Sequence, residues 1–396
     1  MGTDPQGGQV SADVAVVGGG IVGASVAYEL AAGGASVAVM DASFAGRASD
    51  AGAGIVSPET FADPDEEWFE FGRRSSAHLR DLVGRIGSDG VELDEATFSE
   101  CGSLVVALAE HEDRWFTEVA TRATARSSQV TEIAPAEARG LFPALGRVWR
   151  ALHSPTAGRV DGRRLCAGLR AAAERRGVHF VATEALSFES HGDRVDAVVG
   201  ADSAVSCGTV VLAGGAWTAR AARWVGASVP VTPTKGQIVH LKVRTADGSF
   251  AAVGSDTGRW PIVQPVLNFY VVPWPDGRVA CGGTFEPDAG FDERPTAAGV
   301  RDLLREAVTI APGLGDAELV EVRVGFRPES ADDRPILGLL PGTSNVHVCT
   351  GHGANGLLMG PYSGALVARG VLGAAEAIAT DAGGYGPARF AGVRPD

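Results

Sequence analysis

The sequence predicts a protein of combined α/β and α+β class, in which a doubly wound domain with a parallel sheet is interleaved with a domain built on an antiparallel sheet. Three observations lead to this prediction. An apolar run at residues 13–17 (DVAVV) leads straight into a glycine-rich turn and a helical pattern. The same order of strand, glycine turn and helix returns at residues 345–357. Between them, residues 229–324 consist mostly of short β-type runs bounded by turn residues.

The first strand and turn carry a specific motif. Residues 13–17 are apolar on both faces, which is typical of a buried parallel strand, and Gly18-x-Gly20-x-x-Gly23 follows at once. Gly18 permits a tight turn, Gly20 lets a pyrophosphate approach the backbone, and Gly23 lets the helix pack on the strand. Asp41 ends the next predicted strand, where its carboxylate would accept hydrogen bonds from a ribose. The pattern predicts a Rossmann-like dinucleotide site, with a glycine-rich turn that binds no ligand as the alternative.

The order of the segments favours FAD over NAD as the dinucleotide. In a simple NAD dehydrogenase the second mononucleotide half follows the first directly. Here residues 42–66 form a long loop rich in Ala, Gly, Ser and Asp, and the nucleotide-type pattern resumes only near residue 155. A plain NAD dehydrogenase stays open as an alternative.

The glycine turn near the C-terminus is the second indicator of a flavin. It places the start of a helix after a buried strand, so that backbone N–H groups of Asn355, Gly356 and Leu357 would stabilise the negative charge of a reduced flavin. The alternative is a turn that serves packing alone.

The remaining elements follow from periodicity and turn residues. Residues 63–71, acidic and aromatic, are interpreted as a solvated loop rather than a lid over a pocket. A helical pattern restarts with residues 68–71 and continues through 73–86. Further helices are predicted at residues 163–176 and 297–309, and strands at 104–108, 178–182, 186–189, 194–199, 209–212, 237–243, 269–273, 279–282 and 319–324.

Composition excludes several classes of function. The net charge of −14 disfavours nucleic acid and anionic membrane surfaces as partners. The five cysteines include no C-x-x-C pair, so we expect neither a disulfide framework nor a zinc site, and a reducing cytoplasm fits best. The histidines show no metal-ligand spacing, and no metal is expected. We expect neither a signal peptide nor a membrane span.

Eight segments together resemble the D-amino-acid oxidase family of FAD-dependent amine oxidoreductases, in the branch that holds glycine oxidase, sarcosine oxidase and D-amino-acid dehydrogenases. The likeness runs in order along nearly the whole chain. The segments are the Gly18 motif with Ala27 and Leu30, Arg47-x-Ser49, Gly158-Arg159-Val160-Asp161, Ala213-Gly214-Gly215-Ala216-Trp217, Lys235-Gly236-Gln237, Tyr270-Val271-Val272-Pro273, Gly325-Phe326-Arg327-Pro328 and Gly351-His352-Gly353-x-Asn355-Gly356.

The resemblance implies a discontinuous FAD-binding domain of residues 10–85, 155–222 and 330–380. It implies a substrate-binding domain of residues 86–154 and 223–329, with residues 381–396 as a C-terminal tail. The flavin would lie between the two domains.

The resemblance also implies roles for individual residues. Arg327 would bind the substrate carboxylate through its guanidinium fork, and Tyr270 would face the substrate. His352 could act as a base, although a structural role is favoured because a neutral amine can give its α-carbon hydride directly to flavin N5. The cofactor would be held by Gly18, Gly20, Gly23 and Asp41 at its ADP half, by Ser49, Gly54 and Ile55 near the pyrophosphate and ring, by Leu186 at the adenine, and by Gly214, Gly353, Asn355, Gly356 and Leu357 on its other sides.

The chain also departs from its relatives at three places. Glycine oxidase has an arginine where Ala354 stands, so a glycine-specific pocket is not expected. Sarcosine oxidase binds its flavin through a cysteine near the segment Pro328-Glu329-Ser330, which has none, so non-covalent FAD is expected. The lysine that activates oxygen in that enzyme is matched by Ala280, which argues against an efficient oxidase.

The expected activity is FAD-dependent oxidation of the CH–NH bond of an amino acid or N-alkyl amino acid, followed by hydrolysis of the imine. Oxygen, a quinone or a protein could accept the electrons. Two alternatives are a flavin subunit of a heteromeric dehydrogenase and a flavin- or nucleotide-binding protein without turnover. Substrate identity, stereochemistry, pathway and oligomeric state are left open.

Overall fold

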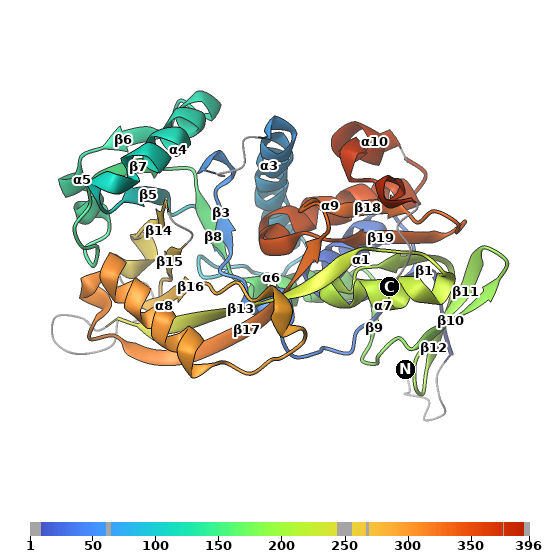
Figure 1. Cartoon of the computed structure of the whole chain (residues 1–396). Helices are drawn as coiled ribbons and strands as arrows, with labels where there is room; N and C mark the ends of the chain where they lie inside the picture. The colour runs from blue at the N-terminus through green and yellow to red at the C-terminus, as the bar shows by residue number, and fades with distance from the viewer. Residues whose placement is uncertain (1–8, 61–64, 244–255, 267–268, 375, 392–396) are drawn as a thin grey trace.

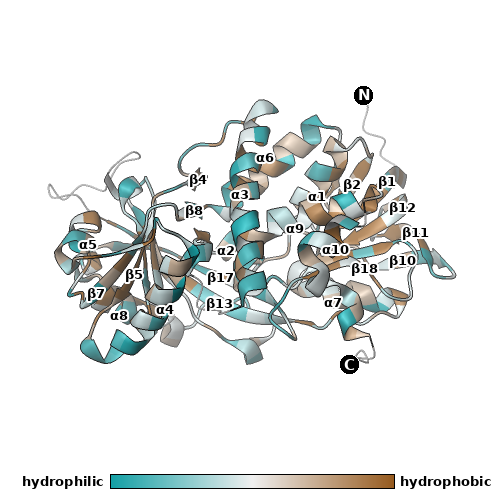
Figure 2. Cartoon of the chain, turned by 90° about the horizontal axis from the view of Figure 1, so that it is seen from above, coloured by the Kyte–Doolittle hydropathy of each residue, from teal (hydrophilic) through white to brown (hydrophobic). Residues whose placement is uncertain are grey.

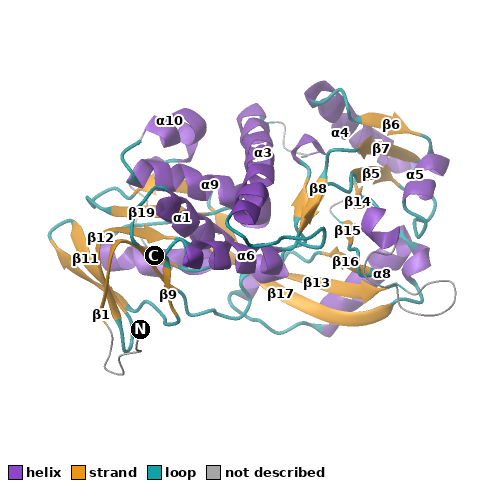
Figure 3. Cartoon of the chain, turned by 180° about the vertical axis from the view of Figure 1, so that it is seen from behind, coloured by secondary structure: helices purple, strands orange, loops and turns teal. Residues whose placement is uncertain are grey.

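The computed structural model describes residues 9–60, 65–243, 256–266, 269–374 and 376–391. Two sheets form the two halves of the molecule, with α3 (Glu66–Ser88) standing between them in the views of Figures 1 and 3. A small third sheet of β3 (Ile55–Val56), β8 (Gly158–Val160) and β4 (Phe98–Ser99) joins the halves.

The first sheet is the doubly wound one. Its path runs β10-β11-β12-β1-β2-β9, and β19 pairs with the end of β12 and with β18. The strands β12, β1, β2, β9 and β19 are joined by parallel pairings, while β10, β11 and β18 join by antiparallel ones. The bounds are β1 (Gln9–Val17), β2 (Val37–Met40), β9 (His179–Val181), β10 (Ser187–His191), β11 (Arg194–Val199), β12 (Ala204–Leu212), β18 (Ile336–Leu339) and β19 (Val346–Thr350).

Helices bury this sheet from water. The helices α1 (Ile21–Ala32) and α9 (Gly356–Val371) pack on each other and are mostly buried, as their nearly uninterrupted apolar sequences predict. Strongly amphipathic α6 (Gly162–Arg175) and α3 cover them with one apolar face each, through Leu165 and Leu169 on α6. The remaining helices are α2 (Ala48–Ala51), α4 (Asp113–Arg126), α5 (Pro135–Leu141), α7 (Thr218–Ala222), α8 (Ala297–Ile310) and α10 (Glu376–Ala382).

The second sheet has the order β17-β13-β16-β15-β14-β5-β7-β6. All pairings in it are antiparallel except that of β5 with β14, so the expected antiparallel sheet contains one parallel pair. These two strands come from distant parts of the chain, so no hairpin dictates their relative direction. The bounds are β5 (Ser103–Ala107), β6 (Thr131–Ile133), β7 (Arg150–Ser154), β13 (Val231–Lys242), β14 (Ile262–Pro265), β15 (Tyr270–Pro273), β16 (Arg278–Gly282) and β17 (Glu318–Ser330). Figure 2 shows apolar strands in both sheets and polar outer helix faces.

The strands of the first sheet fall within residues 10–85, 155–222 and 330–380 apart from the start of β1 at residue 9, and those of the second within 86–154 and 223–329 apart from the last residue of β17. This distribution supports the interleaved domains that we propose. None of the helices in these described segments is both long enough and apolar enough to cross a membrane.

Three segments differ from the sequence-based expectation. The prediction of a solvated loop at residues 63–71 is wrong for its described part from residue 66 on, because Trp68, Phe69 and Phe71 are buried in the first turns of α3, with residues 63 and 64 outside the described residues. The strand predicted to end at residue 324 continues as β17 to Ser330. Residues 381–391 are not a free tail, since Tyr385 is buried with its ring against Phe71.

Candidate active site

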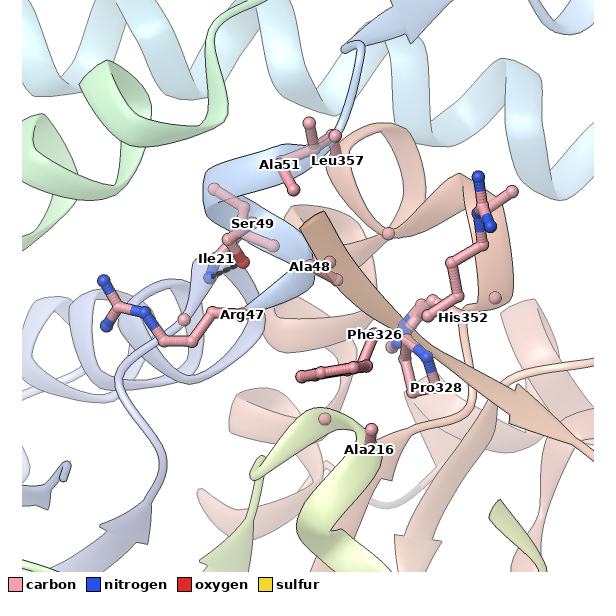
Figure 4. A pocket seen from close by; sticks show the side chains of 18 of the residues that line it. Ile21, Arg47, Ala48, Ser49, Ala51, Ala216, Phe326, Pro328, His352 and Leu357 are labelled. Atoms are coloured by element: carbon pink, nitrogen blue, oxygen red, sulfur yellow. Dashed lines mark hydrogen bonds between the residues drawn. The ribbon is translucent and has the colours of Figure 1, made fainter. Parts of the chain in front are cut away.

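A cavity of about 720 Å³ is lined by residues from both halves of the molecule. Its walls include the Gly18 turn and β15. Figure 4 shows three further parts of the wall, which are α2, β17 at Phe326 and Pro328, and the turn at His352 that leads into α9. Its volume falls within the range of small-molecule and cofactor sites. Of the predicted site residues, all line this cavity except Gly23 and Leu186.

The three motif glycines are required for three different reasons. Gly18 has φ +103°, and a Cβ there would lie 2.6 Å from the carbonyl oxygen of Ala213. A Cβ on Gly23 would overlap the carbonyl oxygen of Gly18, so Gly23 serves the packing of α1 on the turn. A Cβ on Gly20 would meet only the Ser49 hydroxyl, at 3.1 Å, and would otherwise occupy the cavity. Gly20 therefore keeps space open for a ligand.

The N-terminus of α1 opens on this space. Its N-cap residue Gly20 provides no side-chain hydrogen bond, and its first turn has no acidic residue. The Ile21 N–H donates to the Ser49 hydroxyl at 2.9 Å, the contact drawn in Figure 4. A helix start with free N–H groups and a positive dipole end favours a phosphate oxygen.

Asp41 lies beside the same turn. Its Oδ2 accepts a hydrogen bond from the Arg47 guanidinium at 3.0 Å, and a Cβ on Gly19 would lie 2.9 Å from this oxygen. Arg47 also pairs with Asp50. The contact with Asp41 explains a glycine at position 19, which the motif itself does not require.

Of the other residues predicted to hold the cofactor, some line the cavity and one does not. Gly54 and Ile55 line the cavity, and Gly54 has φ +74° because its backbone packs directly on Val160. Gly214 also lines it. Leu186 does not line the cavity, its N–H donates to the Val199 carbonyl at 2.7 Å and its side chain is exposed, so its contact with an adenine stays a prediction. The cavity-lining residues of this segment are Glu184 and Ala185.

The turn into α9 forms the opposite wall. Gly353, Asn355, Gly356 and Leu357 all line the cavity. The N-cap residue Asn355 makes no side-chain cap, and the first turn of α9 contains no acidic residue. Two helix N-termini thus open on one cavity, an arrangement suited to a ligand with two regions of negative charge.

Arg327 and Tyr270 converge at the second domain's side of the cavity. The Arg327 Nη1 donates to the Thr284 carbonyl at 3.0 Å. A Cβ on Gly283 would lie 2.9 Å from the Tyr270 hydroxyl and 3.2 Å from Arg327 Nη2, so both groups lie against this glycine. Burial raises the pKa of Tyr270 to about 12, which keeps its hydroxyl a hydrogen-bond donor at neutral pH.

His352 lines the cavity but is almost fully buried. Neither ring nitrogen has a hydrogen-bond partner among the described residues. Burial lowers the pKa of His352 to about 4, so the ring is neutral at pH 7. A neutral imidazole can accept a proton. Among the described residues, however, no side chain forms a hydrogen bond with the His352 ring that would fix its orientation for such a role.

Two features were missed from the sequence. Glu329 lines the cavity two residues after Arg327, and burial raises the pKa of its carboxyl group. The alternation of β17 could have revealed it had the strand been predicted to its full length. The second feature is an aromatic cluster that joins the domains, with centroid distances of 4.9 to 5.9 Å among Phe44, Trp217, Phe291 and Phe326.

The residues present fit a dinucleotide flavin. The Gly20 cradle and the uncapped start of α1 suit a pyrophosphate, Asp41 suits a ribose, and the start of α9 suits the electron-rich edge of a flavin ring. No group of three or more His, Cys, Asp or Glu suited to a metal was found in the described ranges.

The comparisons agree with this geometry. The chain is 34% identical over 364 residues to YurR of Bacillus subtilis (strain 168), an uncharacterized oxidoreductase, covering 90% of this chain and 94% of that protein. The crystal structure of iminodiacetate oxidase from Chelativorans sp. BNC1 is 34% identical, with a TM-score of 0.83 over 91% of this chain and 95% of that one. The crystal structure of glycine oxidase from Geobacillus kaustophilus is 28% identical, with a TM-score of 0.82, and the match covers 92% of this chain and 95% of that one.

The family model described as FAD dependent oxidoreductase, DAO, matches residues 13–369, which is most of the sequence. Sequence, fold and cavity thus agree with the resemblance, and the chain belongs to the DAO family of FAD-dependent oxidoreductases.

Proposed function

We propose that the protein oxidises the CH–NH bond of an amino acid or N-alkyl amino acid whose carboxylate is bound by Arg327. The observation that carries this proposal is the position of the Arg327 guanidinium, which faces a cavity fitted to FAD and forms no ion pair with a described residue. A planar guanidinium with free N–H groups is suited to a carboxylate.

The surrounding residues orient that substrate. Tyr270 donates its hydroxyl hydrogen beside Arg327, and the thin backbone of Gly236 and Gly283 leaves room for both side chains. Bound FAD supplies a two-electron acceptor for the α-carbon hydride. The chain contributes position and electrostatics, because hydride transfer from a neutral amine requires no base. His352 is proposed to have a structural role.

We further propose that FAD is held without a covalent bond. Segment 328–330 contains no cysteine. Cys349 lines the cavity, but burial raises the pKa of its thiol and keeps it protonated. We expect precipitation of the purified protein with acid to leave all yellow colour in the supernatant. Flavin fluorescence that stays with the protein band on a denaturing gel would contradict this expectation.

The activity itself is tested by an anaerobic visible spectrum. We expect the flavin band of the purified protein to bleach on addition of glycine, N-methylglycine or a larger D- or L-amino acid. Iminodiacetate and simple amines complete the panel. A protein that carries flavin which no compound in this panel bleaches would overturn the proposed function. A protein without flavin would overturn the cofactor assignment.

The electron acceptor is either oxygen or another molecule, such as a quinone or a protein. Two observations favour a quinone or a protein over oxygen. The chain's two lysines, Lys235 and Lys242, do not line the cavity, and Ala280 lies in an apolar cluster with Ile262 and Val272. Slow return of colour in air, without peroxide, would identify a dehydrogenase.

A further inference from the structure

The charged side chains that line the cavity fall into two kinds. Asp41 pairs with Arg47 at 3.0 Å, and Glu184 pairs with Arg220 at 2.7 Å. The other two are Arg327 and Glu329, which form no ion pair with each other or with any further residue that the structure describes. The substrate side of the cavity therefore carries one positive and one negative group that are both available to a ligand.

The strand geometry separates these two groups. Arg327 and Glu329 are two positions apart on β17, so their side chains leave the same face of the strand. The guanidinium of Arg327 lies toward β13 and β16, since a Cβ on Gly236 would lie 2.6 Å from its Cζ. The carboxylate of Glu329 lies against the turn before α9, since a Cβ on Gly353 would lie 2.5 Å from Oε2.

The backbone holds Glu329 in this position. An isolated antiparallel bridge pairs Glu329 with His352, next to the glycine that its carboxylate touches. Gly353 has φ +49°, so the turn itself has a conformation that favours glycine. The carboxylate thus belongs to the wall of the cavity and is not a loose surface group.

We propose that Glu329 binds the positively charged nitrogen of the incoming substrate whose carboxylate binds Arg327, and that it excludes substrates that place a second carboxylate there. The bound ammonium then gives one proton to the Glu329 carboxylate, which leaves the nitrogen neutral for hydride transfer. The inference rests on the proposed function, which it narrows to amino acids with one carboxylate. A negative group facing the cavity attracts a cation and repels an anion, and partial burial strengthens both effects.

The ionisation of Glu329 gives the proposal a pH signature. Burial raises the pKa of Glu329, with Asp333 adding to the effect and Arg327 opposing it. The neighbouring His352 has its pKa lowered to about 4 and does not change charge near neutrality. Only the ionised carboxylate attracts a cation, so substrate affinity should fall as pH decreases toward the pKa of Glu329.

The test uses the FAD-loaded protein and measures dissociation constants from the anaerobic change of the flavin spectrum. Its probes are glycine, which has one carboxylate, and iminodiacetate, which has two. For wild type we expect iminodiacetate to bind about tenfold more weakly than glycine. For Glu329→Gln we expect glycine to bind about tenfold more weakly than it binds wild type, with the preference against iminodiacetate lost. Glu318→Gln, at the exposed start of the same strand, is the control and should leave both constants unchanged.

The pH dependence distinguishes binding from a structural effect. As the pH is lowered, wild type should lose affinity for glycine, and Glu329→Gln should show a flat profile. Equal binding of glycine and iminodiacetate by wild type, or an unchanged ratio in Glu329→Gln, would overturn the role of Glu329 while leaving amino-acid oxidation intact. The wild-type ratio decides the question even if the variant loses FAD. If none of the amino acids tested bleaches the flavin, the proposed function fails instead.

Discussion

Replacement of Arg327 by alanine is expected to lower the efficiency of flavin reduction by amino acids about a thousandfold, equivalent to about 4 kcal/mol. The guanidinium is the cationic group on the substrate side of the cavity, and its loss leaves the substrate carboxylate desolvated and without a partner. The protein should keep its FAD and its fold, because the contacts of Arg327 with the Thr284 carbonyl and the Tyr270 hydroxyl do not involve the Gly18 turn or the start of α9.

Two further variants test whether the loss of efficiency is specific to the guanidinium of Arg327. Arg327→Lys keeps the charge but not the planar fork, so we expect it to recover part of the lost efficiency. Arg305→Ala, on the exposed face of α8, removes an arginine away from the cavity and should behave as wild type. Rapid-mixing kinetics under anaerobic conditions measure the rate and the substrate affinity separately. An Arg327→Ala protein that reduces at more than a tenth of the wild-type efficiency would contradict the assignment of Arg327 as the carboxylate anchor.

Gly20→Ala is expected to abolish FAD binding while the apoprotein stays folded. The added methyl group would occupy the cavity in front of the start of α1, and its nearest neighbour would be the hydroxyl of Ser49. It would therefore exclude the pyrophosphate without disturbing the packing of the domain. Flavin absorbance per mole of purified protein measures the loss, and circular dichroism measures the fold.

The contrasting variant is Gly23→Ala. Here the methyl group would overlap the backbone carbonyl oxygen of Gly18, which cannot move without displacing α1. We expect this variant to lose both FAD and folded protein, with a lower melting temperature or insoluble expression. A Gly20→Ala protein that is yellow, or a Gly23→Ala protein as stable as wild type, would show that the two glycines do not have the roles given above.

Sequence-based prediction succeeded where the residues of a feature lie close together in the sequence, and it failed where they lie far apart. The Gly18 motif and Asp41 are separated by one helix and one strand, so a local pattern was sufficient to bring them to one edge of a sheet. Arg327 has no such local signal. It was predicted only through a family resemblance, because its partners Gly236 and Gly283 belong to strands far from it in sequence.

The misses have the same origin. Glu329 was overlooked because the strand was predicted to end at residue 324, and alternation beyond that point was not considered. The turn into α9, which no pattern near residue 329 can indicate, determines what its carboxylate touches. Leu186 lies just beyond Glu184 and Ala185, which are the residues after β9 that line the cavity.

The order in which the two sheets are built along the chain determines when FAD can bind during synthesis. The cavity needs the Gly18 turn from the beginning of the chain and the Gly353 turn from near its end, and β19 pairs with β12 only after both have been made. A ribosome must therefore pass residue 351 before this cavity can enclose a flavin. A nascent chain arrested before that residue leaves the site without one wall.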